Sequence, residues 1–245
     1  MPSFRNGKVE IAYLDEGEGD PIVLIHGFAS TKEVNWLLTG WFATLTKAGR
    51  RAIALDNRGH GASTKLYDLA DYHSAIMAED VRALLDHLEI ERSDLLGYSM
   101  GSRIAVFLSV AHPARVRSAI LGGLGIHLVD GVGRPESMAE ALEAPTVADV
   151  KDQTGRTFRV FAEQTKSDLR ALTDLDGEPL WDGKADIQVQ LASAVHDAEW
   201  KQSRDQAIGD GEIDLNAGHD PDDWEVYFLE VRGTTKGRLG GGARK

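Results

Sequence analysis

The stretch Ser93–Leu108, SDLLGYSMGSRIAVFL, decides how this sequence is interpreted. Its first half ends at Tyr98 and is a short apolar run typical of a buried strand, whereas residues 103–111 are typical of a helix. Between the two stands Ser99, with a glycine two positions away on each side, in the pattern G-x-S-x-G. A serine at such a junction is either a helix-capping residue or a nucleophile.

The flanking glycines, Gly97 and Gly101, favour the nucleophile. A residue at so sharp a strand-to-helix turn has a strained backbone, and side chains two positions away from it would clash. Glycine avoids the clash and leaves the serine hydroxyl exposed at the carboxyl edge of the sheet, where α/β proteins keep their sites. We therefore expect Ser99 to be a nucleophile, and Ser102 and Ser63 to be ordinary helix and turn residues.

The sequence on both sides of this junction alternates between strand and helix patterns. The expected strands are Val9–Leu14, Pro21–Ile25, Arg51–Leu55 and Val116–Leu121, and the expected helices are Tyr72–Leu88 and Asn35–Ala48, the latter with Leu37, Trp41, Leu45 and Ala48 on one face. Alternation over residues 20–122 predicts an α/β fold with a mostly parallel central sheet and helices on both faces.

The rhythm changes after residue 122. Helical candidates at 136–143, 147–164 and 167–172, without a convincing strand, predict a helical insertion laid over the sheet. The expected division is the N-terminal part of the core at 1–122, the insertion at 123–186, the C-terminal part of the core at 187–231, and a flexible basic tail at 232–245.

Composition excludes several classes of function. Hydrophobic residues make up 42% of the 245 residues and charged residues 27%, an ordinary globular balance. The formal charge of −12 disfavours nucleic acid and anionic membranes as partners. The absence of cysteine excludes disulfides, thiolate zinc sites and cysteine nucleophiles. The sequence has neither a signal-peptide pattern nor an apolar run of membrane-spanning length, so we expect a cytoplasmic protein.

Three motifs together resemble the α/β-hydrolase superfamily. They are the serine junction at Ser99, the turn His26–Phe28 after one expected strand, and Asp56–Ser63, DNRGHGAS, after the next. The resemblance covers about residues 8–125. It implies the α/β-hydrolase fold with a small helical lid, and a serine hydrolase whose triad follows the order Ser, acid, His along the chain. It implies no metal or organic cofactor.

The triad needs a histidine, because a serine hydroxyl is a weak nucleophile until a base takes its proton. Of the eight histidines, most lie in turns that the superfamily uses for shape, on helices, or at the start of the insertion. His196 and His219 remain. The superfamily places its base in a turn of the kind formed by Ala217–His219, so the resemblance favours His219.

The acid should end a strand beside the strand of the histidine, because it orients the imidazole. Residues 187–195 could form that strand, which makes Asp197 the expected acid and Glu199 the substitute. The superfamily pattern of a proline-led apolar strand with a closing glycine is missing here. The apolar spacing also fits a helix over 187–208, so both interpretations stay open.

The segment Trp224–Val231, WEVYFLEV, is a second departure from the superfamily, which has its closing helix at this place. Aromatic and β-branched residues favour a strand instead. If it is the penultimate strand, no histidine or acidic residue follows it to complete a triad. The C-terminal third is then either a compact version of the C-terminal part of the superfamily fold, or a different segment that replaces it.

These patterns predict a serine hydrolase acting on a small ester-like molecule. Backbone N–H groups of Phe28 and Met100 would bind the oxyanion. The apolar candidates of the lid are Phe158, Phe161 and Trp181. The alternative is a ligand-binding protein on the same fold, whose triad was lost through the altered C-terminus.

Overall fold

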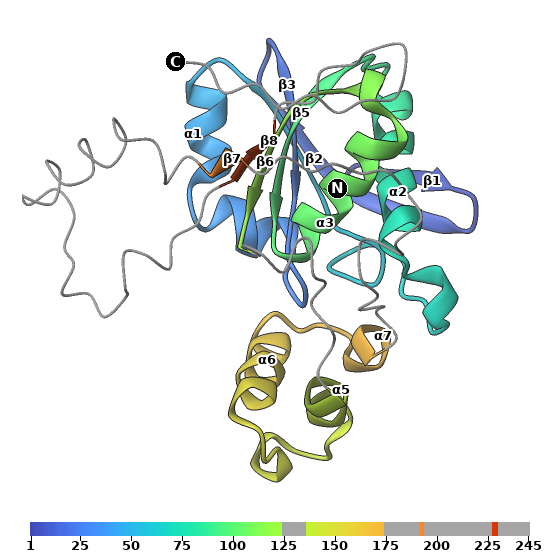
Figure 1. The fold of residues 1–245 in the computed structure, drawn as a ribbon, viewed down its shortest axis with the longest axis vertical. Helices are drawn as coiled ribbons and strands as arrows, with labels where there is room; N and C mark the ends of the chain where they lie inside the picture. The colour runs from blue at the N-terminus through green and yellow to red at the C-terminus, as the bar shows by residue number, and fades with distance from the viewer. Residues whose placement is uncertain (124–135, 174–191, 194–226, 230–245) are drawn as a thin grey trace, which may run out of the picture.

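The computed structural model of the protein describes residues 1–123, 136–173, 192–193 and 227–229 (Figure 1). Its eight-stranded sheet has the order β1-β2-β4-β3-β5-β6-β8-β7. The strands are β1 Ser3–Asn6, β2 Val9–Glu16, β3 Pro21–Ile25, β4 Arg51–Leu55, β5 Ser93–Tyr98, β6 Val116–Gly122, β7 Ala192–Ser193 and β8 Tyr227–Leu229. The helices are α1 Trp41–Lys47, α2 Ser74–His87, α3 Met100–Ala111, α5 Glu136–Glu143, α6 Gln153–Gln164 and α7 Leu169–Thr173.

The centre of the sheet is parallel. Strands β4, β3, β5 and β6 run in one direction, while β2 pairs with β4, and β8 with β6, in the antiparallel sense. Ile25 lies opposite both Leu55 and Gly97, and Gly97 lies opposite Leu121. The carboxyl ends of the four strands therefore meet at one edge, which we call the carboxyl edge. This arrangement confirms the predicted fold.

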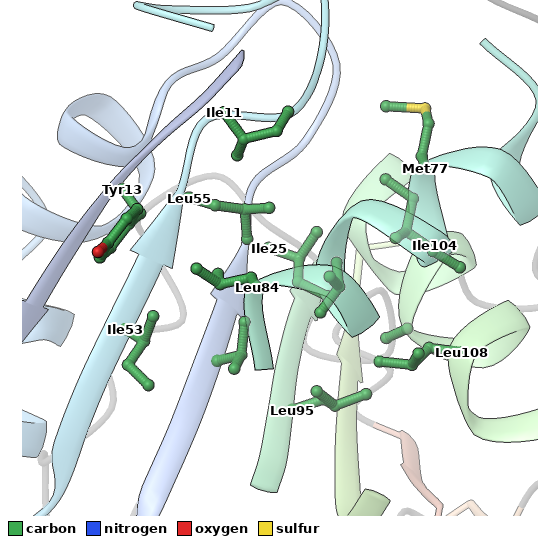
Figure 2. Packing of buried hydrophobic residues seen from close by; sticks show 14 of the residues in the cluster. Ile11, Tyr13, Ile25, Ile53, Leu55, Met77, Leu84, Leu95, Ile104 and Leu108 are labelled. Carbon is green, nitrogen blue, oxygen red and sulfur yellow. The ribbon is translucent and has the colours of Figure 1, made fainter. Parts of the chain in front are cut away.

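Helices cover both faces because alternate residues of each buried strand point to opposite sides. Figure 2 shows one face, where Leu84 of α2 and Ile104 and Leu108 of α3 pack against strand residues such as Ile25 and Leu95. On the other face, Ile22, Leu24, Ala52, Ala54 and Leu96 pack against Trp36 and Phe42. The strands are apolar on both sides, as the continuous runs in the sequence predicted.

The single helix expected over Asn35–Ala48 is wrong in its extent and in its buried face. Gly40 has a φ of 81° and separates a π-helical turn, Glu33–Leu37, from α1. The break shifts the helical phase, so Trp36 and Phe42 are buried while Trp41 is 51% exposed. A left-handed residue is tolerated here because glycine has no Cβ.

The three helices of the insertion lie together beyond one end of the sheet (Figure 1). They occupy the segments where the sequence predicts helices, although residues 147–164 form a 3₁₀ turn, Val147–Asp149, followed by α6. Leu142, Ala162 and Leu172 are buried and belong to the same core as the sheet. Within the described ranges, no helix has the length and apolar character needed to cross a membrane.

The opposite edge of the sheet, at the amino ends of the parallel strands, carries a charge cluster centred on Asp94. Arg117 donates two hydrogen bonds to its carboxylate, at 2.9 and 2.7 Å, and Arg50 and Ser118 donate to it as well. Burial alone would raise the pKa of Asp94, but these hydrogen bonds outweigh it and lower the pKa to about 2. The cluster ties the starts of β4, β5 and β6 together.

Candidate active site

Ser99 lies at the carboxyl edge, in the sharp junction between β5 and α3. Its backbone has φ 51° and ψ −119°, a strained conformation for a residue other than glycine. It occupies the N-cap position of α3, but its side chain makes no capping hydrogen bond. The hydroxyl is therefore not used to cap the helix, which was the alternative to a nucleophile.

The two flanking glycines are required by close backbone packing. A Cβ on Gly97 would lie 2.5 Å from the carbonyl oxygen of Gly101. A Cβ on Gly101 would overlap the carbonyl oxygen of Ile25 and would lie 2.9 Å from that of His26. The clash predicted from the sequence for side chains at these two positions is thus confirmed, and glycine allows α3 to begin directly against the end of β3.

The other two serines near the junction have structural roles, as expected. The hydroxyl of Ser102 lies 2.9 Å from the carbonyl oxygen of Gly97 and 2.8 Å from that of Gly122. The hydroxyl of Ser63 donates to the carbonyl oxygen of Asp56 at 2.7 Å.

The turn His26–Phe28 lies directly beside Ser99. Together with Ala29 and Ser30 we call it the oxyanion loop, after the role predicted for it from the sequence. A Cβ on Gly27 would be 3.3 Å from the Cβ of Ser99. The N–H of Gly27 donates to Asn35 Oδ1 at 3.2 Å, and that of Ala29 to His60 Nε2 at 3.2 Å. The N–H of Phe28, between them, has no hydrogen-bond acceptor among the described residues.

Met100 supplies the second predicted donor. It is the first residue of α3, where backbone N–H groups have no partner within the helix. Its N–H also has no acceptor within the described part of the chain. Among the residues that the structure describes, neither of the two backbone groups expected to bind an oxyanion has an acceptor, and both lie next to Ser99.

His26 and His60 hold the turns at this edge. His26 accepts the Asn57 N–H at Nε2 (3.0 Å), so its Nδ1 carries the proton, which it donates to the Gly27 carbonyl (2.8 Å). His60 likewise accepts from Ala29 at Nε2 and donates from Nδ1 to the Arg58 carbonyl (3.0 Å). With both ring nitrogens engaged, neither histidine is placed to act as a base.

Burial lowers the pKa of His26 to about 4 and that of His60 to about 3. Both rings therefore stay neutral in the folded protein at pH values where the unfolded chain, with an ordinary histidine pKa near 6.5, takes up protons. Below about pH 6.5 the unfolded state binds more protons than the folded state, so stability is lost as the pH falls.

We predict that the free energy of unfolding decreases by about 2 to 3 kcal/mol per pH unit between pH 6 and pH 4.5, since each histidine contributes about 1.4 kcal/mol per unit. Urea denaturation at constant ionic strength measures this slope. The variant His60→Gln should show about half of it. A profile that stays flat from pH 7 to pH 5 would contradict the assignment of two buried neutral histidines.

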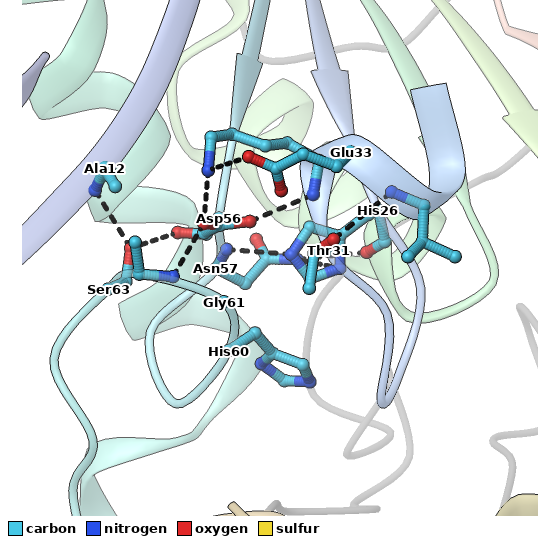
Figure 3. A network of polar contacts seen from close by, with 12 residues as sticks. Ala12, His26, Thr31, Glu33, Asp56, Asn57, His60, Gly61 and Ser63 are labelled. Carbon is cyan, nitrogen blue, oxygen red and sulfur yellow. Dashed lines mark hydrogen bonds and ion pairs between the residues drawn. The ribbon is translucent and has the colours of Figure 1, made fainter. Parts of the chain in front are cut away.

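A buried ion pair between Lys32 and Asp56 links the segment that follows the oxyanion loop to the turn after β4. Asp56 belongs to the network of polar contacts drawn in Figure 3. Lys32 Nζ lies 2.5 Å from Asp56 Oδ2, and both side chains are almost completely buried. The same carboxylate accepts the backbone N–H groups of Lys32 and Ala62 at 2.9 and 2.8 Å. The sequence does not predict this pair, because a lysine in a loop is usually exposed.

The helical insertion touches the carboxyl edge through several side chains. The Phe158 ring packs edge-on against the Phe28 ring, with centroids 5.9 Å apart. The hydroxyl of Tyr67 donates to Asp168 at 2.8 Å, and the guanidinium of Arg170 lies 4.7 Å above the Tyr67 ring. Phe161 packs on the core, and Trp181 lies outside the described residues.

Among the predicted triad residues, only Ser99 lies in the described part of the chain. His219 and Asp197 lie outside it, as do His196 and Glu199. Each of the described histidines has a partner elsewhere: besides His26 and His60, these are His73, which caps α2, His87, which stacks on Phe4, and His112, which bonds Glu79.

The two short strands β7 and β8 indicate where the segment between them begins and ends. Tyr227 of β8 pairs with Leu121 of β6 and with Ser193 of β7. Leu121 lies at the level of Gly97, two residues before Ser99. The chain therefore leaves β7 and enters β8 at the carboxyl edge, and only residues 194–226 stand between these two points.

Comparison with known proteins agrees with this architecture. The α/β hydrolase fold family matches residues 20–174, more than half of the chain. The protein belongs to this family, and the resemblance inferred from Ser99 and the two turns is confirmed.

Three similar proteins illustrate the range of the family. The 2-hydroxymuconate semialdehyde hydrolase of Pseudomonas sp. (strain CF600) is 40% identical over 155 residues, covering 60% of this chain and 50% of that protein. Est816, a structure described as an N-acyl homoserine lactone degrading enzyme, is 27% identical with a TM-score of 0.53 over 73% of each chain. The bottromycin epimerase BotH is 30% identical with a TM-score of 0.55, over 68% of this chain and 66% of its own. The chain spans about half or less of the length of the curated relatives it matches.

Proposed function

We propose that the protein is a serine hydrolase that cleaves a small ester-like molecule, such as a carboxylic ester or a lactone, with Ser99 as nucleophile. The observation that carries this proposal is the geometry at the carboxyl edge. A serine with a positive φ and no capping hydrogen bond lies beside two backbone N–H groups that have no acceptor among the described residues. That combination suits attack on a carbonyl carbon followed by binding of the oxyanion.

In the proposed reaction the oxygen of Ser99 attacks the carbonyl carbon while His219 takes the hydroxyl proton. The N–H groups of Phe28 and Met100 bind the negatively charged oxygen of the tetrahedral intermediate. The intermediate collapses, the alcohol leaves with the proton from His219, and an acyl-enzyme remains. Water, activated by the same histidine, then releases the acid. Asp197 orients the imidazole and stabilises its charged form.

The direction of β7 and β8 supports these two residues. Asp197 follows Ser193 by four positions, and His219 precedes Tyr227 by eight. Because the chain leaves β7 and enters β8 at the carboxyl edge, segments of four and eight residues are long enough to allow Asp197 and His219 to approach Ser99, since eight residues span at most about 27 Å. No histidine follows Val231, which would exclude a triad if the triad residues had to follow β8. Because β8 is antiparallel to β6, the residues that precede β8 are the ones that lead into the carboxyl edge, so a histidine before the strand can serve.

The helical insertion acts as the lid of the site and sets substrate choice in this proposal. Its Phe158 contacts Phe28, whose N–H is one of the proposed oxyanion donors. The neighbour Est816, described as an N-acyl homoserine lactone degrading enzyme, supports a small acyl substrate in this proposal.

The test combines labelling and turnover. A fluorophosphonate should add once per chain, on Ser99, as mapped by mass spectrometry, and a short acyl ester reporter should be hydrolysed. Ser99→Ala should abolish both, whereas Ser102→Ala should still be labelled at Ser99. Labelling of a different serine would overturn the proposal.

A second candidate is a ligand-binding protein without hydrolytic turnover. It is supported by the likeness to BotH, since the structure of that protein holds bottromycin A2 and is described as an epimerase, not as a hydrolase. Saturable binding of a small acyl compound, with no turnover and no labelling of Ser99, would support this function instead.

A further inference from the structure

Ala29, in the oxyanion loop, is held in a strained conformation from both sides. It is fully buried, with a φ of 55°, which is unfavourable for a residue with a Cβ. Its N–H donates to His60, and its carbonyl oxygen accepts from Thr165 at 2.7 Å and from Ser167 at 3.3 Å. Strain of this kind persists only where the surroundings fix it.

The two hydroxyls come from the end of α6, whose geometry directs them to one oxygen. The N–H of Ser167 bonds the Ala162 carbonyl at 2.8 Å and that of Lys166 bonds the Glu163 carbonyl at 3.0 Å, which is the Schellman arrangement. Lys166 has a φ of 56°, so a second strained residue stands at this contact. The turn at Lys166 places Thr165 and Ser167 on the same side.

Each hydroxyl has one proton to donate. Thr165 Oγ1 lies closer to the Ala29 carbonyl, at 2.7 Å, than to the Ala162 carbonyl, at 3.0 Å, or to Ser167 Oγ, at 2.9 Å. Thr165 therefore donates to the Ala29 carbonyl. The Ser167 hydroxyl can donate to Thr165 Oγ1, or to the Ala29 carbonyl itself. Removing both hydroxyls leaves the carbonyl without these donors.

Two hydrogen-bonded peptides connect these hydroxyls to Phe28. The Ala29–Ser30 peptide accepts at its oxygen from Thr165, and its N–H donates to the Gly27 carbonyl at 3.3 Å. The Gly27 carbonyl belongs to the same peptide as the N–H of Phe28. Each hydrogen bond in such a series orients and polarises the next one.

We infer that Thr165 and Ser167 are positioning residues: by holding the Ala29 carbonyl they aim and polarise the Phe28 N–H for the oxyanion. The inference rests on the proposed serine hydrolase function. In this inference the insertion does more than cover the site, because the end of α6 also fixes the orientation of the Phe28 N–H.

The test is the double variant Thr165→Val/Ser167→Ala with the ester reporter. Removing an oxyanion donor outright lowers kcat about 10²- to 10³-fold, so loosening one should lower kcat by roughly 10- to 100-fold with little change in KM. Thr165→Ser should retain nearly full kcat, because it keeps the hydroxyl. Thr157→Val is the matched control, since this hydroxyl on the same helix bonds only its own helix, at Gln153.

A second readout is independent of turnover. Hydrogen exchange of the Ala29 amide, measured by NMR, should become faster in the double variant and stay unchanged in Thr157→Val. Unchanged kcat or unchanged exchange in a folded double variant would overturn the inference while leaving the hydrolase proposal in place. If the wild-type protein neither hydrolyses the ester nor is labelled at Ser99, the proposed function is wrong. The positioning role of Thr165 is then wrong as well.

Discussion

Gly101→Val should yield no folded protein. The Cβ of any side chain at this position would overlap the Ile25 carbonyl, and the neighbouring backbone belongs to a central strand that cannot move without breaking its ladder. Overpacking of a core typically costs about 1 to 3 kcal/mol, but a clash with the backbone of Ile25 and His26 exceeds what side-chain rearrangement relieves. Soluble yield and circular dichroism measure the outcome.

Gly122→Ala is the matched control for this prediction. A Cβ on Gly122 would lie 3.6 Å from the Tyr98 ring, an ordinary contact, so this variant should fold and melt near the wild-type temperature. Gly101→Ala should already be severely destabilised, since the Cβ of alanine is the atom that would overlap the Ile25 carbonyl. A well-folded Gly101→Ala protein would show that the approach of α3 to β3 is looser than the structure has it.

His219→Ala should lower kcat for the ester reporter by several orders of magnitude, because without the base the hydroxyl of Ser99 keeps its proton. His196→Ala is the control on the same segment and should retain activity. Both variants should melt like the wild type. If His196 were essential and His219 were not, His196 would be the base. Asp197 could then no longer be assigned as the acid.

Asp197→Asn tests the third member of the proposed triad. The equivalent change in a Ser-His-Asp protease lowers kcat about 10⁴-fold by permitting the wrong imidazole tautomer. A comparable loss here, with Glu199→Gln active, would support Asp197. If Asp197 is a surface residue, the substitution should change kcat less than about twofold, as surface replacements usually do.

The centre of the fold could be predicted because its signals are local. The apolar runs at Pro21–Ile25 and Arg51–Leu55 are strands with the predicted bounds, and the glycines around Ser99 are explained by contacts that the motif itself implies. In each of these cases the deciding residues lie within a few positions of one another, so one window of sequence holds the information.

Contacts between distant segments could not be predicted in the same way. The charge of the buried Lys32 is paired with its neighbour Glu33 and with Asp56, which is 24 positions away in the sequence. The break at Gly40 was missed because the apolar residues continue past it in a helical pattern. At Tyr227–Leu229 the composition indicated a strand but gave no direction, since aromatic and β-branched residues favour parallel and antiparallel strands alike.

The charge cluster around Asp94 has a consequence for laboratory evolution. It ties β4, β5 and β6 together at the end of the sheet that faces away from Ser99. Strands of five or six residues separate the two ends by about 13 to 17 Å, and substitutions so far apart usually have additive effects. Residues around Ser99 and in the helical insertion can therefore be varied in a library. Stabilising substitutions at the opposite end should offset the stability that such changes cost.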